Sequence, residues 1–290
     1  MIEASEKTEQ IQAKARELLD RGEVACVIGY EVGPRGIVRP FFAYEPDEAD
    51  RLVWNDRCDH NLTTYLHDWK HPRARGQEPP RLGIVAKACD ARALNVLLQE
   101  KQLARERLHV IGVVCQGMNN GDDRTLQARC ERCAERTPVV YDTLVGEPTV
   151  VPARTDWANV EALEGMAARE RLDFWMSEFE RCLRCYACRQ ACPACYCYEC
   201  LAEQVDPQWV DIGIDFPEKY FFHITRAYHL AGRCVDCDAC ERVCPVNIRL
   251  SLLNRRIARE IAELFDFTPG LLPDEPSPLT TFRPNEELPL

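Results

Sequence analysis

Cysteine is the residue type in this chain whose number and spacing point most directly to chemistry. There are 17 cysteines among the 290 residues, and eight of them form two strings with the same spacing, C-x2-C-x2-C-x3-C-P. This spacing is typical of bacterial ferredoxin loops, whose thiolates bind [4Fe–4S] cubanes and whose fourth cysteine binds the cluster of the other loop. The predicted cluster ligands are Cys182, Cys185, Cys188 and Cys192 in the first string, and Cys234, Cys237, Cys240 and Cys244 in the second.

Zinc and disulfides are the alternatives for so many cysteines. Structural zinc sites use pairs of C-x2-C knuckles, without a third cysteine and a repeated C-x3-C-P ending. Eleven of the 17 cysteines fall between residues 182 and 244 at short spacings, and clustered cysteines in a reduced, cytosolic chain more often hold metals than disulfides. We therefore expect two [4Fe–4S] clusters at the two strings.

Nine cysteines lie outside the two strings. Cys26 falls within an apolar run and is expected to be a buried core residue. The other eight are candidates for a further metal centre, either a third cluster or a zinc site, or are packing thiols, and the sequence leaves these alternatives open. They are Cys195, Cys197 and Cys200, directly after the first string, and Cys58, Cys89, Cys115, Cys130 and Cys133 in the first half.

The first half of the chain has the alternating pattern of an α/β domain. Apolar, β-branched runs predict strands at 24–30, 82–88 and 109–114, and an amphipathic pattern predicts a helix over 6–20. A further helix is expected between the second and third strands, with Asp90 as its candidate cap. Strand, helix and strand over 33 residues is the size of a βαβ unit, so we expect a partly parallel sheet. Residues 45–81 and 116–155 are predicted to be rich in loops.

Polar residues follow the carboxyl ends of the last two predicted strands. In open parallel sheets, ligands bind at this edge, against helix N-termini. No G-x-G-x-x-G or Walker loop is present, which disfavours an ordinary dinucleotide or nucleoside-triphosphate site. The residues expected to line a ligand crevice there are Lys87, Asp90, Arg92, Gly117 and Asn119, beside Cys89 and Cys115.

The character of the sequence changes after about residue 160. Apolar residues at helical spacing precede, separate and follow the two cysteine strings, so we expect the clusters to lie in an all-helical ferredoxin-like domain. The predicted organisation is an α/β domain over 1–160, a helical dicluster domain over 161–268 and a tail over 269–290. The tail contains six prolines and is expected to be extended, disordered or docked on a partner.

Charge and hydropathy narrow the classes of partner. The chain carries 36 basic and 47 acidic residues, a net charge of −11, which argues against binding to nucleic acid or to an anionic membrane surface. No apolar stretch reaches the roughly 18–20 residues of a membrane span. The N-terminal residues MIEASEKTEQ lack the basic and apolar regions of a secretory signal. A cytoplasmic location is therefore expected.

Two pairs of segments resemble a known family. KACDARALNVLLQEKQ with VIGVVCQGMNNG resembles the N-terminal half of the beta-subunit family of deazaflavin (coenzyme F420) hydrogenases and formate dehydrogenases. RCLRCYACRQACPACYCYEC with GRCVDCDACERVCPVNI resembles the iron–sulfur half of members found in formate dehydrogenase and heterodisulfide-reductase-like assemblies. The resemblance implies an electron-transfer subunit of a multi-subunit cytoplasmic oxidoreductase. It also implies FAD in some members, and partners such as a hydrogenase, a formate or other dehydrogenase, or a heterodisulfide-reductase-like flavoprotein.

Three functions follow as hypotheses. The first is a relay without its own substrate site, passing single electrons through two clusters between a catalytic and an electron-accepting subunit. The second is a flavin-containing subunit, with the flavin in the crevice of residues 87–119, that exchanges hydride with a (deaza)flavin or nicotinamide carrier and splits it into single electrons for the clusters. The third is an assembly scaffold. No Ser–His–Asp, HExxH or paired-carboxylate pattern is present, so the relay is the leading prediction.

Overall fold

The fold is described from a computed structural model of the chain. The residues described are 2–69, 78–121, 125–149, 156–275 and 277–279, with the side chains of residues 2–5 left aside. The chain divides into two compact units, which are treated separately below. The first unit is Met1–Thr155 with Gly270–Glu275, and the second unit is Asp156–Pro269 with Pro276–Leu290.

The first unit is built on a five-stranded, mostly parallel sheet. Its strand order is β2-β1-β3-β4-β5, with β2 antiparallel to β1 and the other neighbours parallel. This confirms the prediction of an α/β region with a partly parallel sheet. The strands are β1 (Val27–Val32), β2 (Val38–Ala43), β3 (Leu82–Ala86), β4 (Leu108–Val113) and β5 (Thr143–Val145).

Two strands were not predicted. β2 carries Pro40, which lowers its strand propensity, and the strand is tolerated because it lies at the edge of the sheet. β5 has only three residues, within the segment 116–155 that was expected to be loop, and too few to show a period. The strand predicted at 24–30 begins later, at Val27.

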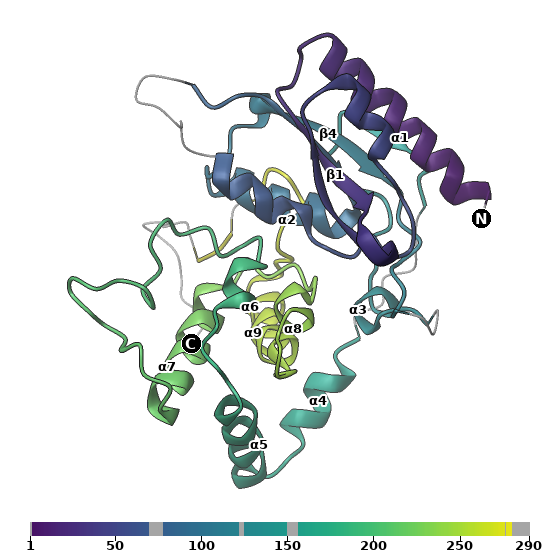
Figure 1. The fold of residues 1–290 in the computed structure, drawn as a ribbon. Coiled ribbons are helices and arrows are strands. Elements are labelled where there is room, and N and C mark those ends of the chain that lie inside the picture. The colour runs from purple at the N-terminus through teal and green to yellow at the C-terminus, as the bar shows by residue number, and fades with distance from the viewer. Residues whose placement is uncertain (1, 70–77, 122–124, 150–155, 276, 280–290) are drawn as a thin grey trace. The chain divides into compact units, whose positions relative to one another are not determined.

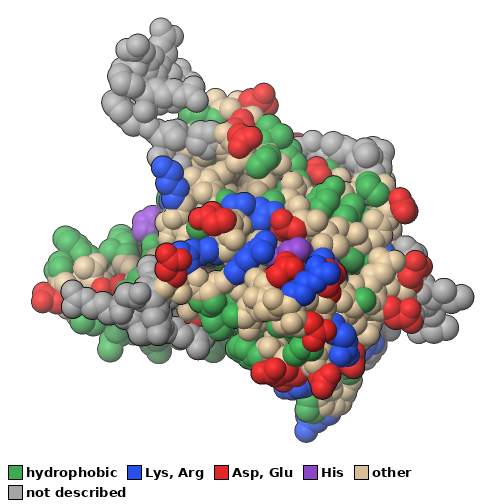
Figure 2. Space-filling view, turned by 90° about the horizontal axis from the view of Figure 1, so that it is seen from above, with side chains coloured by type: hydrophobic (Ala, Val, Ile, Leu, Met, Phe, Trp, Pro, Cys, Tyr) green, Lys and Arg blue, Asp and Glu red, His purple; other side chains and the backbone are tan. Residues whose placement is uncertain are grey.

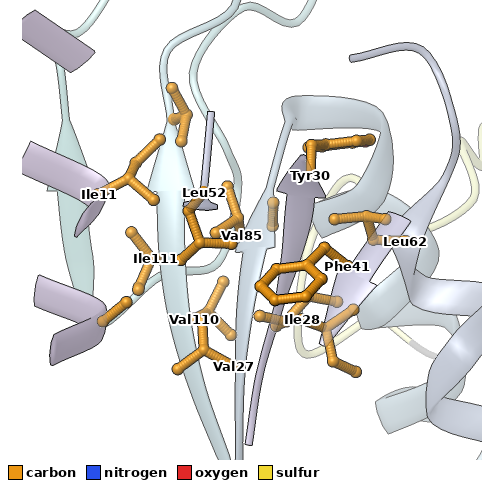
Figure 3. Close-up of a cluster of buried hydrophobic side chains, with 14 of the residues drawn as sticks. Ile11, Val27, Ile28, Tyr30, Phe41, Leu52, Leu62, Val85, Val110 and Ile111 are labelled. Carbon is orange, nitrogen blue, oxygen red and sulfur yellow. The ribbon is translucent and has the colours of Figure 1, made fainter. Parts of the chain in front are cut away.

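Helices lie on both faces of the sheet, with α1 and α2 on opposite sides (Figure 1). Because the central strands are covered on both faces, their side chains are buried throughout, as in β3 and β4. Figure 3 shows the apolar side chains that join α1, the strands and the loops in one core. The helices are α1 (Ile2–Asp20), α2 (Ala88–Gln99) and α3 (Ala128–Glu131), with 3-10 turns at Pro34–Gly36, Pro46–Arg51, Leu62–Trp69 and Arg105–Arg107.

Part of the proline-rich tail packs on α2. The Asn95 side chain donates a hydrogen bond to the Gly270 carbonyl at 3.2 Å, and Gln99 donates to the carbonyls of Leu272 and Glu275 at 2.7 and 2.6 Å. Gly270 has φ +68°, and a Cβ atom there would lie 2.0 Å from the Arg92 carbonyl oxygen, so only glycine fits. Residue 276 and residues 280–290 lie outside the described part, and partner docking of the tail stays a prediction.

The second unit contains helices and loops, without a strand among its described residues. Helices were predicted before, between and after the two cysteine strings, and α5, α7 and α9 lie there. α4 was not predicted, because its seven residues are too few for a periodic pattern. The helices are α4 (Ala158–Glu164), α5 (Ala168–Glu180), α6 (Ala187–Gln190), α7 (Phe216–His229), α8 (Ala239–Arg242) and α9 (Leu250–Phe265).

The net charge of the sequence argues against a large basic surface, and Figure 2 shows the charged side chains on one face of the protein. On the face seen in Figure 2, acidic and basic side chains are interspersed, and no continuous basic patch is visible there. Within the described residues, no helix combines the length and the apolar character needed to cross a bilayer.

Candidate metal centre

The two cysteine strings fold into loops of the same shape. In each loop the second and fourth residues after the first cysteine have left-handed backbone angles: Arg184 and Tyr186 at φ 52° and 58°, and Asp236 and Asp238 at φ 57° and 51°. Such angles are uncommon for residues other than glycine. Each left-handed residue reverses the chain between two cysteines, so the thiols of one loop are turned toward a common side. α6 and α8 then begin at the same position of each string.

The end of each loop is also alike. The backbone N–H of the fourth cysteine bonds to the carbonyl three residues earlier, from Cys192 to Arg189 at 3.2 Å and from Cys244 to Glu241 at 3.0 Å. A proline follows in both strings and, having no N–H, cannot continue the helical bonding. The fourth thiol is therefore separated from the first three of its own loop by a short helix.

The two loops lie against each other in one core. α6 and α8 are in contact, and a buried cluster includes thiols of both strings. Phe179 of α5 and Phe222 of α7 pack on this cluster and hold the loops from outside. The cysteines in the cluster are Cys182, Cys188 and Cys240, with Cys244 partly buried beside them.

The fourth cysteine of each string lies near thiols of the other string. One cavity is lined by Cys192 together with Cys234, Cys237 and Cys240. On the other side, burial raises the pKa of Cys182, and the neighbouring thiols of Cys185 and Cys244 raise it further. These contacts group the eight predicted ligands into two sets of four thiols, called quartets below. The first quartet is Cys182, Cys185, Cys188 and Cys244; the second quartet is Cys192, Cys234, Cys237 and Cys240.

Hydrogen-bond donors point at sulfur in both quartets. The Arg184 backbone N–H lies 3.3 Å from Cys182 Sγ, and the Ile248 N–H lies 3.4 Å from Cys244 Sγ. In the second quartet, the Asn254 amide donates to Cys240 Sγ at 3.6 Å. Donors of this kind favour the thiolate, which is the form that binds iron.

One buried cation faces both quartets and was missed in the sequence. Arg226 of α7 is 7 % exposed and donates to the Cys188 carbonyl at 3.0 Å. Burial opposes its charge, but the thiols of Cys195, Cys192 and Cys240 outweigh burial and raise the pKa of Arg226. The sequence could have indicated that Arg226 is buried, because it follows Phe222 by four residues and so lies on the same face of α7.

A single metal ion and a cubane require different arrangements of cysteine thiols. Among the described residues, no group of three or more His, Cys, Asp or Glu side chains is close enough to hold one metal ion. A zinc ion needs every sulfur within about 2.3 Å of one point, whereas a cubane places each cysteine on a different iron. The binding of a cubane by each quartet stays a prediction.

The three cysteines that follow the first string lie beside a separate pocket. Cys195, Cys197 and Cys200 line it with Arg189 and Arg226. A hydrogen bond with Cys192 lowers the pKa of Cys195 to about 6 and, together with burial, raises that of Cys192, so the two thiols titrate as a pair. Whether these cysteines bind a metal stays a prediction.

In the first unit, the polar residues of the predicted crevice bind one another. Lys87 Nζ lies 2.9 Å from Asp90 Oδ2 and 2.6 Å from the His60 carbonyl, and also contacts the Tyr30 hydroxyl; both charged side chains are buried. Asp90 does not occupy the cap position: it is the third residue of α2 and accepts a bond from the Lys87 N–H at 2.9 Å.

The other crevice residues are distributed around this pair. Arg92 is half-buried on α2, and Gly117 is buried with φ +105°. The Asn119 side chain donates to Asp56 Oδ2 at 2.7 Å. Flavin binding by these residues stays a prediction.

Comparison with known proteins gives partial matches. No family model matches the chain. It is 32 % identical over 100 residues to the F420-dependent formate dehydrogenase subunit beta of Methanocaldococcus jannaschii, covering 34 % of this chain and 26 % of that protein. It is 32 % identical over 108 residues to the F420-dependent formate dehydrogenase 1 subunit beta of Methanococcus maripaludis, covering 37 % and 27 %. The chain spans about a quarter of the length of these relatives. Over about a third of its length, this chain is therefore similar to the beta subunits of F420-dependent formate dehydrogenases.

Proposed function

We propose that the chain is the electron-transfer iron–sulfur subunit of a multi-subunit oxidoreductase. In this role it relays single electrons between a catalytic subunit and an electron-accepting subunit. The observation that carries the proposal is the exchange of fourth cysteines: Cys192 lines a cavity with the first three thiols of the other string. That exchange is the arrangement that ferredoxins use to hold two [4Fe–4S] clusters.

Each quartet would hold one cluster, and each cluster would accept and release one electron at a time. The chain itself supplies the setting. Backbone N–H groups at Cys182 and Cys244 stabilise the thiolates, and Phe179 and Phe222 limit the access of water. Arg226 balances part of the negative charge of both quartets. These residues bind and tune a redox group, and none of them suggests a substrate site.

The partner is inferred from the relatives. The matched proteins are beta subunits of F420-dependent formate dehydrogenases, and we propose an assembly of that type, in which a formate-oxidising subunit reduces the clusters of this chain. When this chain is mixed with formate and a formate dehydrogenase catalytic subunit, its clusters should become reduced. The reduction should be measured as a loss of the visible absorbance of the clusters. Reduction that is no faster than without the catalytic subunit would contradict this pairing.

Iron content tests the two clusters directly. After anaerobic purification, Cys182→Ala and Cys234→Ala should each lower the iron content by about four atoms, and both together by about eight. Cys26→Ala, at a buried position that belongs to neither quartet, should leave iron unchanged. An unchanged iron content in the double variant would refute the ligand assignment. The release of one flavin per chain by acid would contradict the simple relay and support the flavin-containing alternative.

A further inference from the structure

A histidine buried on α7 has no hydrogen-bond partner among the described residues. His223 is 2 % exposed, and neither Nδ1 nor Nε2 of its ring meets a donor or an acceptor there. Burial, and then the charges of Arg226 and Arg184, lower the pKa of His223 to about 3, so the imidazole is neutral. A neutral imidazole carries one N–H donor, and buried donors are almost always satisfied. The partner of this N–H is therefore expected outside the described polypeptide.

The neighbours of His223 on α7 bind the loop of the first cysteine string. Lys219, four residues earlier, donates to the Glu180 carbonyl at 2.7 Å, just before the string. Arg226, three residues later, donates to the Cys188 carbonyl at 3.0 Å. Residues three and four apart lie on one face of an α-helix. His223 therefore faces the same loop, between these two contacts.

Aromatic contacts hold the imidazole beside the first string. The His223 ring stacks on Phe179, with the ring centroids 4.8 Å apart and the planes at 14°. The Phe179 carbonyl in turn accepts the backbone N–H of Cys182 at 3.0 Å. Phe222, next to His223 in the chain, packs edge-on against Tyr186 of the string, with centroids 5.2 Å apart. These contacts fix the plane of the imidazole close to the first quartet.

Packing alone does not require a histidine at this position. Phe179 and Phe222 are apolar neighbours, and a phenylalanine would occupy similar space without burying an unpaired donor. A buried donor without a partner destabilises the fold, whereas a hydrogen bond to a bound group compensates for its burial. Sulfur in the first quartet already accepts donors of this kind, as the Arg184 N–H shows at Cys182 Sγ.

We propose that His223 donates a hydrogen bond from its ring N–H to a sulfur atom of the cluster in the first quartet. The inference rests on the proposed function, in which this quartet holds a [4Fe–4S] cubane. A reduced cluster carries one more negative charge than an oxidised one, so a donor to its sulfur stabilises the reduced form and raises the reduction potential. The bond makes the first cluster a better electron acceptor than it would be without His223.

Redox titration of two matched variants tests this assignment. His223→Phe keeps an aromatic ring but removes the N–H, and His229→Phe makes the same change at an exposed position of α7. Each is combined with Cys234→Ala, which removes a ligand of the second cluster, in full-length protein reconstituted anaerobically. EPR is read at the potential that half-reduces the first cluster of the Cys234→Ala parent.

The ratio of reduced to oxidised first cluster should fall about tenfold in His223→Phe, which is about 59 mV for a one-electron couple. It should stay at the parent value in His229→Phe. His223→Gln, whose amide also donates, should recover part of the ratio. Equal ratios in His223→Phe and His229→Phe would overturn the proposal.

The second cluster provides a control within the same protein. In the Cys182→Ala background, which removes a ligand of the first cluster, His223→Phe should leave the ratio of the second cluster unchanged. An equal fall in both backgrounds would overturn the assignment to the first quartet. Iron content distinguishes this outcome from failure of the proposed function: a Cys234→Ala parent without iron would refute the cluster itself, whereas about four irons with an unchanged ratio would refute only the role of His223.

A second measurement does not depend on how the His223→Phe variant folds. The Cys234→Ala protein is labelled with nitrogen-15 in histidine alone, reduced and studied by pulsed EPR. A nitrogen-15 nucleus coupled to the spin of the first cluster is expected, and the coupling should persist when His229→Phe is added. A spectrum without a coupled nitrogen-15 would overturn the proposal.

Discussion

At the scale of single residues, the position of a cation decides how easily the quartets accept electrons. Arg226 is the buried arginine whose charge reaches thiols of both quartets. A positive charge in a site of low dielectric favours the reduced, more negative cluster. Its replacement should therefore act on both clusters, although the side chain binds neither.

We expect Arg226→Gln to lower the reduction potentials of the two clusters. An interaction of about 1 kcal/mol corresponds to roughly 40 mV for a one-electron couple, so shifts of tens of millivolts are expected. Redox titration followed by EPR measures them. Arg226→Lys should retain most of the original potential, and Arg169→Gln, an exposed change on α5, should have no effect. If the reduction potentials do not change in Arg226→Gln, the charge of Arg226 does not influence the clusters.

A second residue-scale prediction concerns an acid buried in the first unit. The side chain of Glu31 is 8 % exposed and contacts Arg39 and Arg51 at 2.7 and 2.6 Å. Burial alone would raise its pKa, but hydrogen bonds from the two arginines outweigh burial and lower the pKa below the usual 4.5. Since the pKa is lowered on folding, the stabilisation is present above pH 4.5 and is lost as pH falls through the folded-state pKa.

Glu31→Gln should therefore lower the free energy of unfolding by about 1–2 kcal/mol at pH 7. This is less than the 3–5 kcal/mol of a fully buried pair, because both arginines are half-exposed. Thermal unfolding followed by circular dichroism at several pH values measures the effect, and the gap to the unchanged protein should narrow below pH 4.5. The exposed change Glu106→Gln is the control. A gap that is constant with pH would contradict the ionic explanation.

At the scale of elements, the last described segment of the first unit depends on one glycine. Gly270→Ala places a methyl group 2.0 Å from the Arg92 carbonyl, at a positive φ, and should release residues 270–275 from α2. The strain amounts to about 1–3 kcal/mol or more. Hydrogen exchange of residues 270–275 should increase in the variant. Gly165→Ala, where the added atom would meet nothing closer than 3.4 Å, is the control. Unchanged exchange would show that this docking does not need the glycine.

The elements also show what the sequence could predict. Buried strands such as β3 and β4 were found because their apolar runs are continuous, whereas Pro40 concealed β2. Spacing alone predicts eight cysteines as cluster ligands, since a cubane loop constrains the chain locally. Contacts between distant residues, such as Arg226 with both strings or Lys87 with Tyr30, carry no local signature. The predicted crevice was placed from the strand ends, and the sequence could not anticipate that Lys87 and Asp90 bind each other.

At the scale of the whole molecule, the second unit should bind iron without the first. A fragment of residues 156–269 contains both quartets and the helices that pack on them. Produced alone and reconstituted anaerobically, it should hold about eight irons. The same fragment with Cys234→Ala should hold about four. A fragment that is helical by circular dichroism but binds no iron would show that the quartets need the first unit.

The path of the chain through the two units has a further consequence. The chain builds the sheet of the first unit, forms the second unit, and then returns so that residues 270–275 complete the surface of α2. Residues 156–269 are therefore an insertion in the fold of the first unit, which continues at residue 270. Shortening the chain at residue 269 should therefore destabilise the first unit, which loses residues 270–275, and it also removes residues 276–290 of the second unit.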